Sequence, residues 1–317
     1  MVPHKKPNPP YEYDLEKELI SLRNYRDSKQ DRSIPAKSAQ NLLVATWNLT
    51  NMGLQERTDN DYQLMAEIIS WFDLIAVQEI AIDLTGFRKL MSFLPNYSTV
   101  VSDPGGNHER LGFIYDKNKV NLQEMIGEVA VPPADHRYIR MKTVSGIFTG
   151  FDRNPYIASF RAGNLDFVMV SVHLYFGGKA WYYKDRRTLE TYAVARWGDL
   201  RRKSDSSYSK NIMILGDFNL EKKDENDPVY KALKSKGLLL PVHTSKVGSS
   251  LGGDKEYDQV AFFPGEMKSK FSGNSGVFDF DGGIFADAWN NRPDDFKDII
   301  KYHIADHRPL WAEFNIE

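Results

Sequence analysis

The sequence predicts a layered α/β domain, because apolar runs of strand length alternate with segments of helical periodicity along most of its 317 residues. No internal repeat or low-complexity block interrupts this alternation. Hydrophobic residues make up 41% of the chain and charged residues 26%, which is the balance of a globular protein and not of a disordered one. A chain of this length can bury a sizeable core between layers of sheet and helix.

The first part of the chain is predicted to be an N-terminal extension, residues 1 to 40, with the α/β domain assigned to residues 41 to 317. Four of the first ten residues are proline, which favours an extended lead-in. Tyr13 to Tyr25 has apolar residues at helical spacing and predicts one helix. The remainder of the extension is mostly polar and is expected to form a linker or a clasp on the body.

Beyond residue 40, short apolar runs bounded by polar or turn residues predict the strands. They are Leu42 to Trp47, Leu74 to Val77, Leu111 to Tyr115, Tyr156 to Arg161, Phe167 to Val172, Ile212 to Leu215, Asp258 to Phe263 and Leu310 to Ile316. Helical periodicity predicts helices at Tyr62 to Phe72, Arg186 to Lys203 and Asp227 to Lys236. Glycine-rich stretches at Asp103 to Asn107, Gly248 to Gly253 and Phe271 to Gly276 predict loops.

The composition excludes several kinds of site. The formal net charge is -2, so no global positive field attracts the chain to nucleic acid, and local cations must hold any polyanion. The chain has no cysteine, which excludes a disulfide framework, a thiol nucleophile and a thiolate metal site. The lack of cysteine, of an apolar signal segment and of a membrane-spanning run predicts a cytoplasmic protein, with export through a removed signal left open. We expect a monomer.

Polar side chains capable of catalysis stand next to five of the expected strands. Asn48, Glu79 and His173 follow three of them, Gly216-Asp217-Phe218-Asn219 follows a fourth, and Asp306-His307 precedes the closing one. Each feature alone is weak, since Gly-Asp turns and single histidines are common in structural roles. Together and in this order, they predict one site built on a β scaffold, and they point to metal-assisted hydrolysis.

Hydrolysis of a phosphodiester requires a cation on the phosphate, an activated water, and a proton or charge stabilisation for the leaving oxygen. Glu79 and Asn48 suit Mg²⁺, which prefers oxygen ligands and keeps several waters. His173 and His307 suit the proton transfers, because an unperturbed imidazole has a pKa of about 6.5. Each imidazole needs a carboxylate to fix its tautomer, and we expect Asp258 and Glu109 to fill that role.

Several motifs resemble those of the endonuclease/exonuclease/phosphatase superfamily, most closely its deoxyribonuclease I branch in a bacterial-type, cysteine-free form. They are Thr46-Trp47-Asn48, Val77-Gln78-Glu79, Ser171-Val172-His173-Leu174, Gly216-Asp217-Phe218-Asn219, Tyr257-Asp258-Gln259-Val260 and Asp306-His307-Arg308-Pro309. Tyr97 to Val120 and Arg153-Asn154-Pro155 resemble that branch specifically. The resemblance covers residues 41 to 317 and implies a four-layer α/β/β/α sandwich, in which two packed mixed β-sheets are flanked by helices.

The resemblance also implies roles for single residues. Glu79 would be the main metal ligand, assisted by Asn48, with Asp217, Asn219 and Asp306 around the scissile phosphate or a second cation. His307 with Asp258, and His173 with Glu109, would be the two acid-base pairs. Which imidazole is the base stays open, and some relatives are argued to use the Asp of Gly-Asp-x-Asn. Mg²⁺ is expected, with Mn²⁺ or Ca²⁺ as alternatives, and Arg153 and Asn219 are expected to contact phosphate.

The expected substrate is DNA, with duplex favoured and the deoxyribonuclease I type of endonuclease as model. Ala81 and Asn107 stand where the vertebrate deoxyribonuclease has groove-contacting Arg and Tyr, so the substrate is less defined than the chemistry. The alternatives are a phosphomonoesterase, a sphingomyelinase-like lipid phosphodiesterase, or a non-catalytic binding module. Trp181-Tyr182-Tyr183, with Arg186 and Arg187 nearby, predicts either a base-stacking and phosphate-contacting surface or the amphipathic start of a helix.

Overall fold

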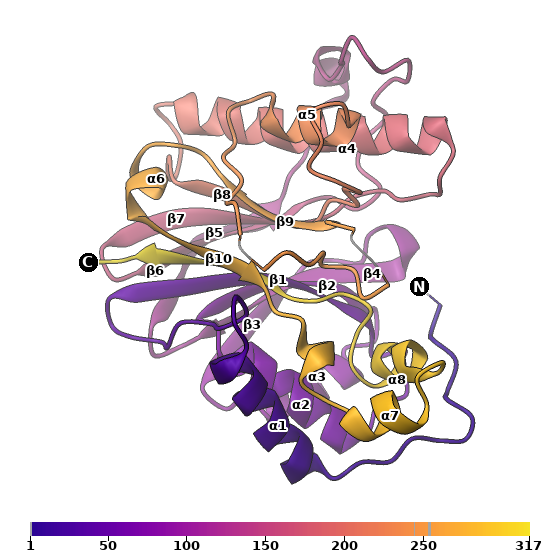
Figure 1. Cartoon of the computed structure of the whole chain (residues 1–317). Helices are drawn as coiled ribbons and strands as arrows, with labels where there is room; N and C mark the ends of the chain where they lie inside the picture. Colours follow the sequence, from indigo (N-terminus) through magenta and orange to yellow (C-terminus); the bar gives the residue numbers. More distant parts are fainter. Residues whose placement is uncertain (1, 244, 253–254) are drawn as a thin grey trace.

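Two β-sheets pack face to face between two layers of helices in the computed structural model, which describes residues 2–243, 245–252 and 255–317 (Figure 1). The first sheet has the order β10 (Phe271–Val277), β11 (Leu310–Asn315), β1 (Asn41–Met52), β2 (Leu74–Ala81), β4 (Glu109–Asp116) and β3 (Tyr97–Val101). The second has the order β5 (Val120–Glu128), β6 (Tyr156–Ala162), β7 (Leu165–His173), β8 (Ile212–Asp217) and β9 (Asp258–Phe262). This confirms the predicted four-layer α/β/β/α sandwich.

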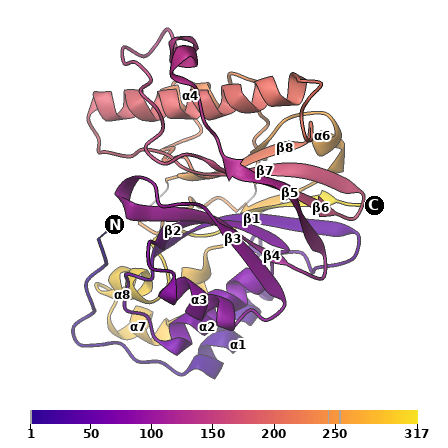
Figure 2. The ribbon, with the colours of Figure 1, turned by 180° about the vertical axis from the view of Figure 1, so that it is seen from behind.

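Helices cover the outer face of each sheet (Figures 1 and 2). On the first sheet lie α1 (Leu15–Ser28), α2 (Asp59–Ser70), α3 (Thr85–Ser92), α7 (Ala286–Asn291) and α8 (Phe296–His303). On the second lie α4 (Trp181–Lys203) and α5 (Pro228–Lys234). A short helix α6 (Glu266–Lys270) links β9 to β10, and 3₁₀ turns form at Gly106–His108, Pro133–Tyr138 and Phe280–Gly282.

Strand β1 shows how the sequence builds these layers. Its side chains alternate between the two faces of the sheet, as the pleat of a strand requires. Leu42 and Val44 pack into the core between the sheets, whereas Leu43, Ala45 and Trp47 pack against the helices. Because both faces are covered, every residue of β1 is buried, and the strand reads as a continuous apolar run in the sequence.

The N-terminal segment lies against the body. Leu19 and Leu22 of α1 join the core under the first sheet, and the Lys37 Nζ bonds Asp116 Oδ2 at 2.6 Å. These contacts agree with a clasp and not with a free linker. The division of the chain into an extension, residues 1 to 40, and a domain, residues 41 to 317, remains a prediction.

The structure corrects three boundaries that the sequence predicts. Phe271 to Gly276 is not a loop but most of β10, an edge strand whose pairing with β11 overrides its glycine content. Helix α4 begins at Trp181 and not at Arg186, so the aromatic cluster forms its first turn. Strands β1 and β2 continue past Asn48 and Glu79, so those side chains lie within the strands and not after them.

Irregular backbone explains how Asn48 and Glu79 point out of continuous strands. The register between β1 and β2 breaks after Asn48, and the register between β2 and β4 breaks between Val77 and Ile80. Glu79 has φ +59° and Thr50 has φ +50°, a region that costs energy for residues with a Cβ. Bulges of this kind redirect side chains at functional sites.

Among the described residues, the model has no helix that is both long and apolar enough to cross a membrane.

We predict that the docking of α1 contributes to global stability. Leu22 is fully buried, so Leu22→Ala should lower the free energy of unfolding by about 2–5 kcal/mol in a urea titration. Ile20 lies on the opposite, exposed side of the same helix, with 55% of its surface accessible. Ile20→Ala should therefore change the free energy of unfolding by less than about 0.5 kcal/mol. Equal stability of the two variants would contradict the docked position of α1.

Candidate active site

The predicted site residues meet at one edge of the sandwich, where the ends of strands from both sheets converge. The first sheet supplies Asn48, Glu79 and Glu109, and the second supplies His173, Asp217 and Asp258. The segment before β11 adds Asp306 and His307. The structure therefore brings together side chains that are far apart in the sequence.

His307 and Asp258 form the first imidazole-carboxylate pair. The Nδ1 of His307 lies 2.7 Å from Asp258 Oδ2, and its Nε2 lies 3.8 Å from Asp217 Oδ2. Burial disfavours the imidazolium, but these carboxylates outweigh it and hold the pKa of His307 well above its ordinary value. The Trp47 indole donates to the carbonyl of His307 at 2.8 Å, which fixes the backbone that carries the ring.

His173 and Glu109 form the second pair. The Nδ1 of His173 lies 2.5 Å from Glu109 Oε1, and its Nε2 lies 3.5 Å from Asp217 Oδ2. Burial and the Arg153 guanidinium both lower the pKa of His173, but the nearby carboxylates outweigh them and raise it overall. The two Nε2 atoms thus face the same oxygen, Asp217 Oδ2, from two sides.

The turn after β8 holds Asp217 and Asn219 in place. Asn219 donates its backbone N–H to Asp217 Oδ1 at 2.8 Å and its side-chain amide to the carbonyl of Leu174 at 2.8 Å. Gly216, which precedes them, has φ +140°, and a Cβ there would lie 2.0 Å from the carbonyl oxygen of Val172. Only glycine allows β8 to pass this close to β7.

Glu79 and Asn48 lie side by side. The Asn48 Nδ2 is 3.0 Å from Glu79 Oε1 and 3.4 Å from Asp217 Oδ2, while its Oδ1 accepts from the N–H of Thr50 at 3.0 Å. The N–H of Asn51 donates to Glu79 Oε2 at 2.9 Å. The carboxylates of Glu79 and Asp217 therefore converge on the side-chain NH₂ group of Asn48, the positive end of its amide dipole. A place where two carboxylates converge is suited to a cation.

Asp306 lies at the rim of the site. Thr50 Oγ1 donates to Asp306 Oδ1 at 2.6 Å, and the His4 Nε2 lies 3.6 Å from Asp306 Oδ2. Burial would raise the pKa of Asp306, but the nearby imidazoles of His4 and His307 and the hydrogen bond from Thr50 lower it overall. Asp306 is therefore held as a carboxylate, and its place near the phosphate or a second cation stays a prediction.

Arg153 lies closer to the protein interior than a phosphate-contacting role suggests. Its side chain is 3% exposed, and its Nε lies 3.1 Å from Glu109 Oε1 and donates to the carbonyl of His173 at 2.7 Å. Another guanidinium nitrogen donates to the carbonyl of Leu174 at 3.1 Å. In this structure Arg153 supports the His173–Glu109 pair, and its contact with phosphate stays a prediction.

Two further arginines hold the site together, and sequence reasoning missed this role. Arg57 donates to the carbonyls of Thr50 and Ile304 at 2.8 and 2.7 Å, joining the β1 loop to the segment before Asp306. Arg187 donates to the carbonyl of Asn219 at 2.8 Å and to that of Tyr175 at 3.0 Å. In the sequence, Arg187 is notable only as a cation near a cluster of aromatic residues. No local sequence pattern points to Arg57.

The acidic and imidazole side chains can hold a metal. Candidate ligand atoms lie within 4.8 Å of one another in two groups, Glu79–Glu109–His173 and Asp217–Asp258–His307. The predicted ligand set of Glu79, Asn48, Asp306 and Asp217 matches neither group, because Glu79 falls in the first group and Asp217 in the second. One oxygen of each buried carboxylate, Glu109 Oε2 and Asp258 Oδ1, also lacks a hydrogen-bond partner among the described residues. Such a surplus of buried carboxylate oxygen fits a hard divalent cation, which would offset the negative charge.

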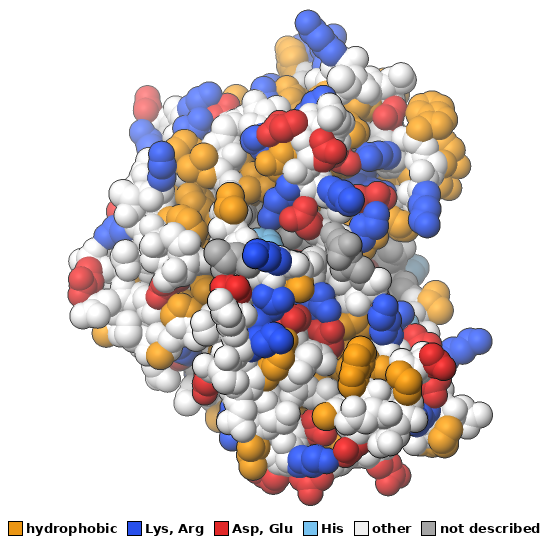
Figure 3. Space-filling model, viewed as in Figure 1, with side chains coloured by type: hydrophobic (Ala, Val, Ile, Leu, Met, Phe, Trp, Pro, Cys, Tyr) orange, Lys and Arg blue, Asp and Glu red, His pale blue; other side chains and the backbone are white. Residues whose placement is uncertain are grey.

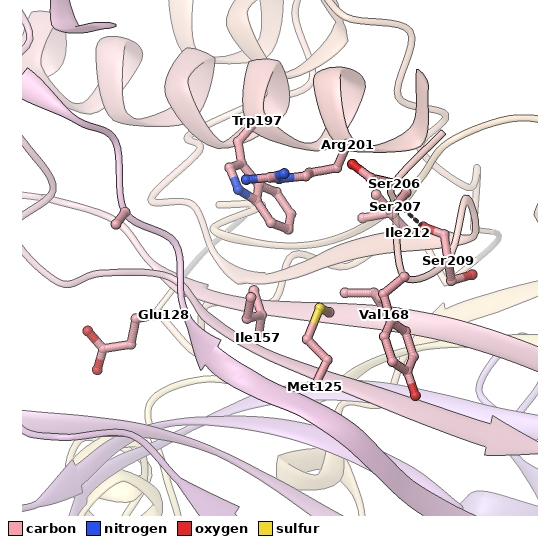
Figure 4. Close-up of a pocket in the computed structure, with 12 residues that line it drawn as sticks. Met125, Glu128, Ile157, Val168, Trp197, Arg201, Ser206, Ser207, Ser209 and Ile212 are labelled. Carbon is pink, nitrogen blue, oxygen red and sulfur yellow. Dashed lines mark hydrogen bonds between the residues drawn. The ribbon is translucent and has the colours of Figure 1, made fainter. Parts of the chain in front are cut away.

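A separate pocket of about 310 Å³ lies between α4 and the outer face of the second sheet (Figure 4). Trp197 and Arg201 of α4 lie above an apolar floor that includes Met125, Ile157 and Val168 (Figure 4). No histidine and no residue of the candidate active site lines this pocket. This pocket is distinct from the candidate active site.

Comparison with known proteins finds distant relatives. No protein-family model matches the chain. A deoxyribonuclease of Thioalkalivibrio sp. (strain K90mix) is 26% identical over 199 residues, covering 59% of this chain and 48% of that protein. An endonuclease/exonuclease/phosphatase family domain-containing protein 1 of Xenopus laevis is 25% identical over 265 residues, covering 74% and 44%. The chain thus spans about half the length of the curated relatives it matches.

Solved structures with the same fold include an endonuclease/exonuclease/phosphatase family protein from Bacteroides thetaiotaomicron. It superposes with a TM-score of 0.58 at 16% identity, over 87% of this chain and 98% of that one. D. rerio TDP2 in complex with a single-strand DNA product gives a TM-score of 0.57 at 13% identity, over 87% and 99%. A mannosyl-6-phosphatase of B. thetaiotaomicron gives 0.54 at 16%, over 86% and 99%. At these identities the similarity is one of fold.

We predict that Asp258 holds up the pKa of His307 in the cation-free protein. Asp258→Asn should lower the pKa of His307, because burial lowers that pKa and the carboxylate charge that counteracts burial is gone. NMR titration of the ¹⁵N-labelled imidazoles, with chelator present, measures the pKa. Since the folded pKa exceeds the unfolded value of about 6.5, the pair's contribution to stability is complete below pH 6.5 and is lost as pH rises through the folded pKa.

The matched control for this titration is Asp166→Asn, which removes a surface carboxylate paired with Arg161. It should leave the His307 titration unchanged. An unaltered His307 pKa in Asp258→Asn would show that another group sets it.

Proposed function

We propose that this chain is a member of the endonuclease/exonuclease/phosphatase superfamily and acts as a divalent-cation-dependent phosphodiesterase that hydrolyses DNA, which its similarity to a deoxyribonuclease and to an endonuclease/exonuclease/phosphatase family domain-containing protein supports. One observation carries the proposal. Two imidazoles, His173 and His307, are each supported by a carboxylate at Nδ1 and direct their Nε2 atoms at one oxygen of Asp217. Such a pair can serve both proton transfers of phosphodiester hydrolysis.

The proton transfers divide between the two imidazoles. One takes the proton of the attacking water, and the other gives a proton to the leaving oxygen, so that in-line attack inverts the configuration at phosphorus. Glu109 and Asp258 fix the ring tautomers and raise the pKa of His173 and His307, which favours the protonated form needed by the acid. Asp217, which lies within 4 Å of both rings, and Asn219 in the same turn are assigned to orient the phosphate and the water.

Glu79 is assigned as the main ligand of the cation, with Asn48 beside it and with Asp306 and Asp217 toward the phosphate. The cation, Mg²⁺ with Mn²⁺ or Ca²⁺ as alternatives, would neutralise phosphate charge and make the attacking water more acidic. The chain contributes the geometry: the bulge in β2 directs Glu79 into the site, and the N–H of Asn51 orients its carboxylate. DNA as substrate is supported by the deoxyribonuclease among the relatives.

We predict cation-dependent nicking of supercoiled plasmid by the purified protein. His173→Ala and His307→Ala should each lower the rate by about 10²–10⁴-fold, because each removes an acid-base group. His136→Ala, which removes an imidazole that bonds the carbonyl of Val131, is the matched control and should leave the rate unchanged. Chelator should abolish nicking.

If well-folded wild-type protein does not nick DNA in Mg²⁺ or Mn²⁺, the substrate assignment is wrong. Sphingomyelin and small phosphate monoesters would then be tested with the same variants. Hydrolysis of either one, lost in both histidine variants, would keep the chemistry and replace the substrate.

We also predict that Glu79 sets the cation affinity. Glu79→Gln keeps the side-chain shape but removes its charge, so half-maximal activity should require at least about tenfold more Mg²⁺, and calorimetric titration should show the same loss. Glu128→Gln, a change at an exposed carboxylate, is the control. An unchanged Mg²⁺ requirement in Glu79→Gln would exclude Glu79 as the main ligand.

A further inference from the structure

A row of aromatic rings leads from the active site onto the first turn of α4. The ring centroids are 5.9 Å apart for Tyr175 and Tyr183, 4.2 Å for Tyr183 and Tyr182, and 5.8 Å for Tyr182 and Trp181. The outer end of the row is open to solvent, with Trp181 69% and Tyr182 51% exposed. Phe176, in the loop that begins the row, is 38% exposed.

The row is fixed to the active site at its inner end. The buried Arg187 guanidinium donates to the carbonyls of Tyr175 and Phe176, each at 3.0 Å, and to that of Asn219 at 2.8 Å. The residue before the row, Leu174, accepts the side-chain amide of Asn219 through its carbonyl. The loop that starts the row therefore shares its hydrogen-bonding partners with the site, and the rings are preorganised beside it.

Cations accompany the rings. The guanidinium of Arg186 lies 3.9 Å from the ring centroid of Tyr175. Lys179 is exposed and pairs with no carboxylate in the part of the chain that the structure describes. On the face seen in Figure 3, hydrophobic side chains gather at the upper right edge, over the end of α4 nearest the site, with Lys and Arg side chains next to them.

We propose that the aromatic row of Tyr175, Phe176, Trp181, Tyr182 and Tyr183 stacks the bases of an unpaired nucleic-acid segment next to the scissile phosphate. This inference rests on the proposed function and makes unpaired nucleotides the preferred substrate, in place of the duplex that the sequence favours. The bases of an intact duplex stack on one another and offer no free faces, whereas unpaired bases stack on aromatic rings. Lys179 would meet the phosphates of the same segment, while Arg186, which pairs with Asp152 and Glu190, holds the Tyr175 ring in place.

The composition of the row favours nucleotides over a lipid surface. Between Tyr175 and Tyr183 the only aliphatic side chain is that of Ala180, and a four-residue segment that contains Lys179 separates the first two rings from the last three. A surface that inserts into acyl chains buries a continuous apolar face. Aromatic rings with a lysine between them suit a nucleotide chain instead, because its bases can stack on the rings and its phosphates can contact the lysine.

Binding of fluorescently labelled oligonucleotides tests the proposal, with chelator present to prevent cleavage. Wild-type protein should bind a mixed-sequence single strand more tightly than the same sequence as blunt duplex, measured by anisotropy. Trp181→Ala and Tyr182→Ala should each weaken single-strand binding by about tenfold and reduce the preference over duplex. Trp181→Phe, which keeps a ring, should retain most of the affinity.

Trp289→Ala is the matched control, because Trp289 is 60% exposed on α7, in the opposite helix layer. It should bind both oligonucleotides as wild type does. Equal binding of single strand and duplex by wild type, or full single-strand affinity in Trp181→Ala, would overturn the proposal even if plasmid nicking stands. Loss of affinity in Trp289→Ala as well would also overturn it, since the effect would then not be specific to the row.

Two other outcomes separate this inference from its rivals. Binding to sphingomyelin vesicles that is lost in Trp181→Ala, without oligonucleotide binding, would overturn the proposal in favour of a lipid surface. Trp181-dependent oligonucleotide binding without hydrolysis of any DNA would support the aromatic row and refute the proposed nuclease activity.

Discussion

Burial of several carboxylates and two imidazoles at the junction of two sheets is the constraint around which this structure is arranged. A buried carboxylate is stable only when it is paired or hydrogen-bonded. Asp258 meets His307, Glu109 meets both His173 and Arg153, and Asp217 lies within 4 Å of both imidazoles. These contacts offset the cost of burying the charged groups, and they also fix the geometry on which the proposed chemistry depends.

Buried guanidinium groups keep the loops of this cluster in register. Arg153 bonds the backbone at the end of β7, Arg187 bonds the loop after β7 to the turn after β8, and Arg57 bonds the loop of β1 to the segment before β11. Each of them donates to backbone carbonyls near a strand end or in a loop. A planar group with five donors suits this task better than a lysine does.

Local strain accompanies the same loops. Glu79, Thr50 and Asn219 all have positive φ, and all three lie in or beside the cluster. Strained backbone persists where surrounding contacts determine it, and here the contacts are those to Asn51, Asp306 and Leu174. Fold stability and site geometry are therefore linked: the packed sheets provide the energy that holds these residues in unfavourable conformations.

Short local patterns are enough to predict the layered α/β class, most strand positions and the polar residues assigned to the chemistry. Apolar runs next to Asn48, Glu79, His173 and Asp217 are visible without any structure. How those residues combine depends on contacts between distant segments. The Asp258–His307 contact spans 49 positions, and the bulge that directs Glu79 depends on its register with β1 and β4. The inward position of Arg153 and the role of Arg57 depend on carbonyls from distant segments, so no local pattern can encode them.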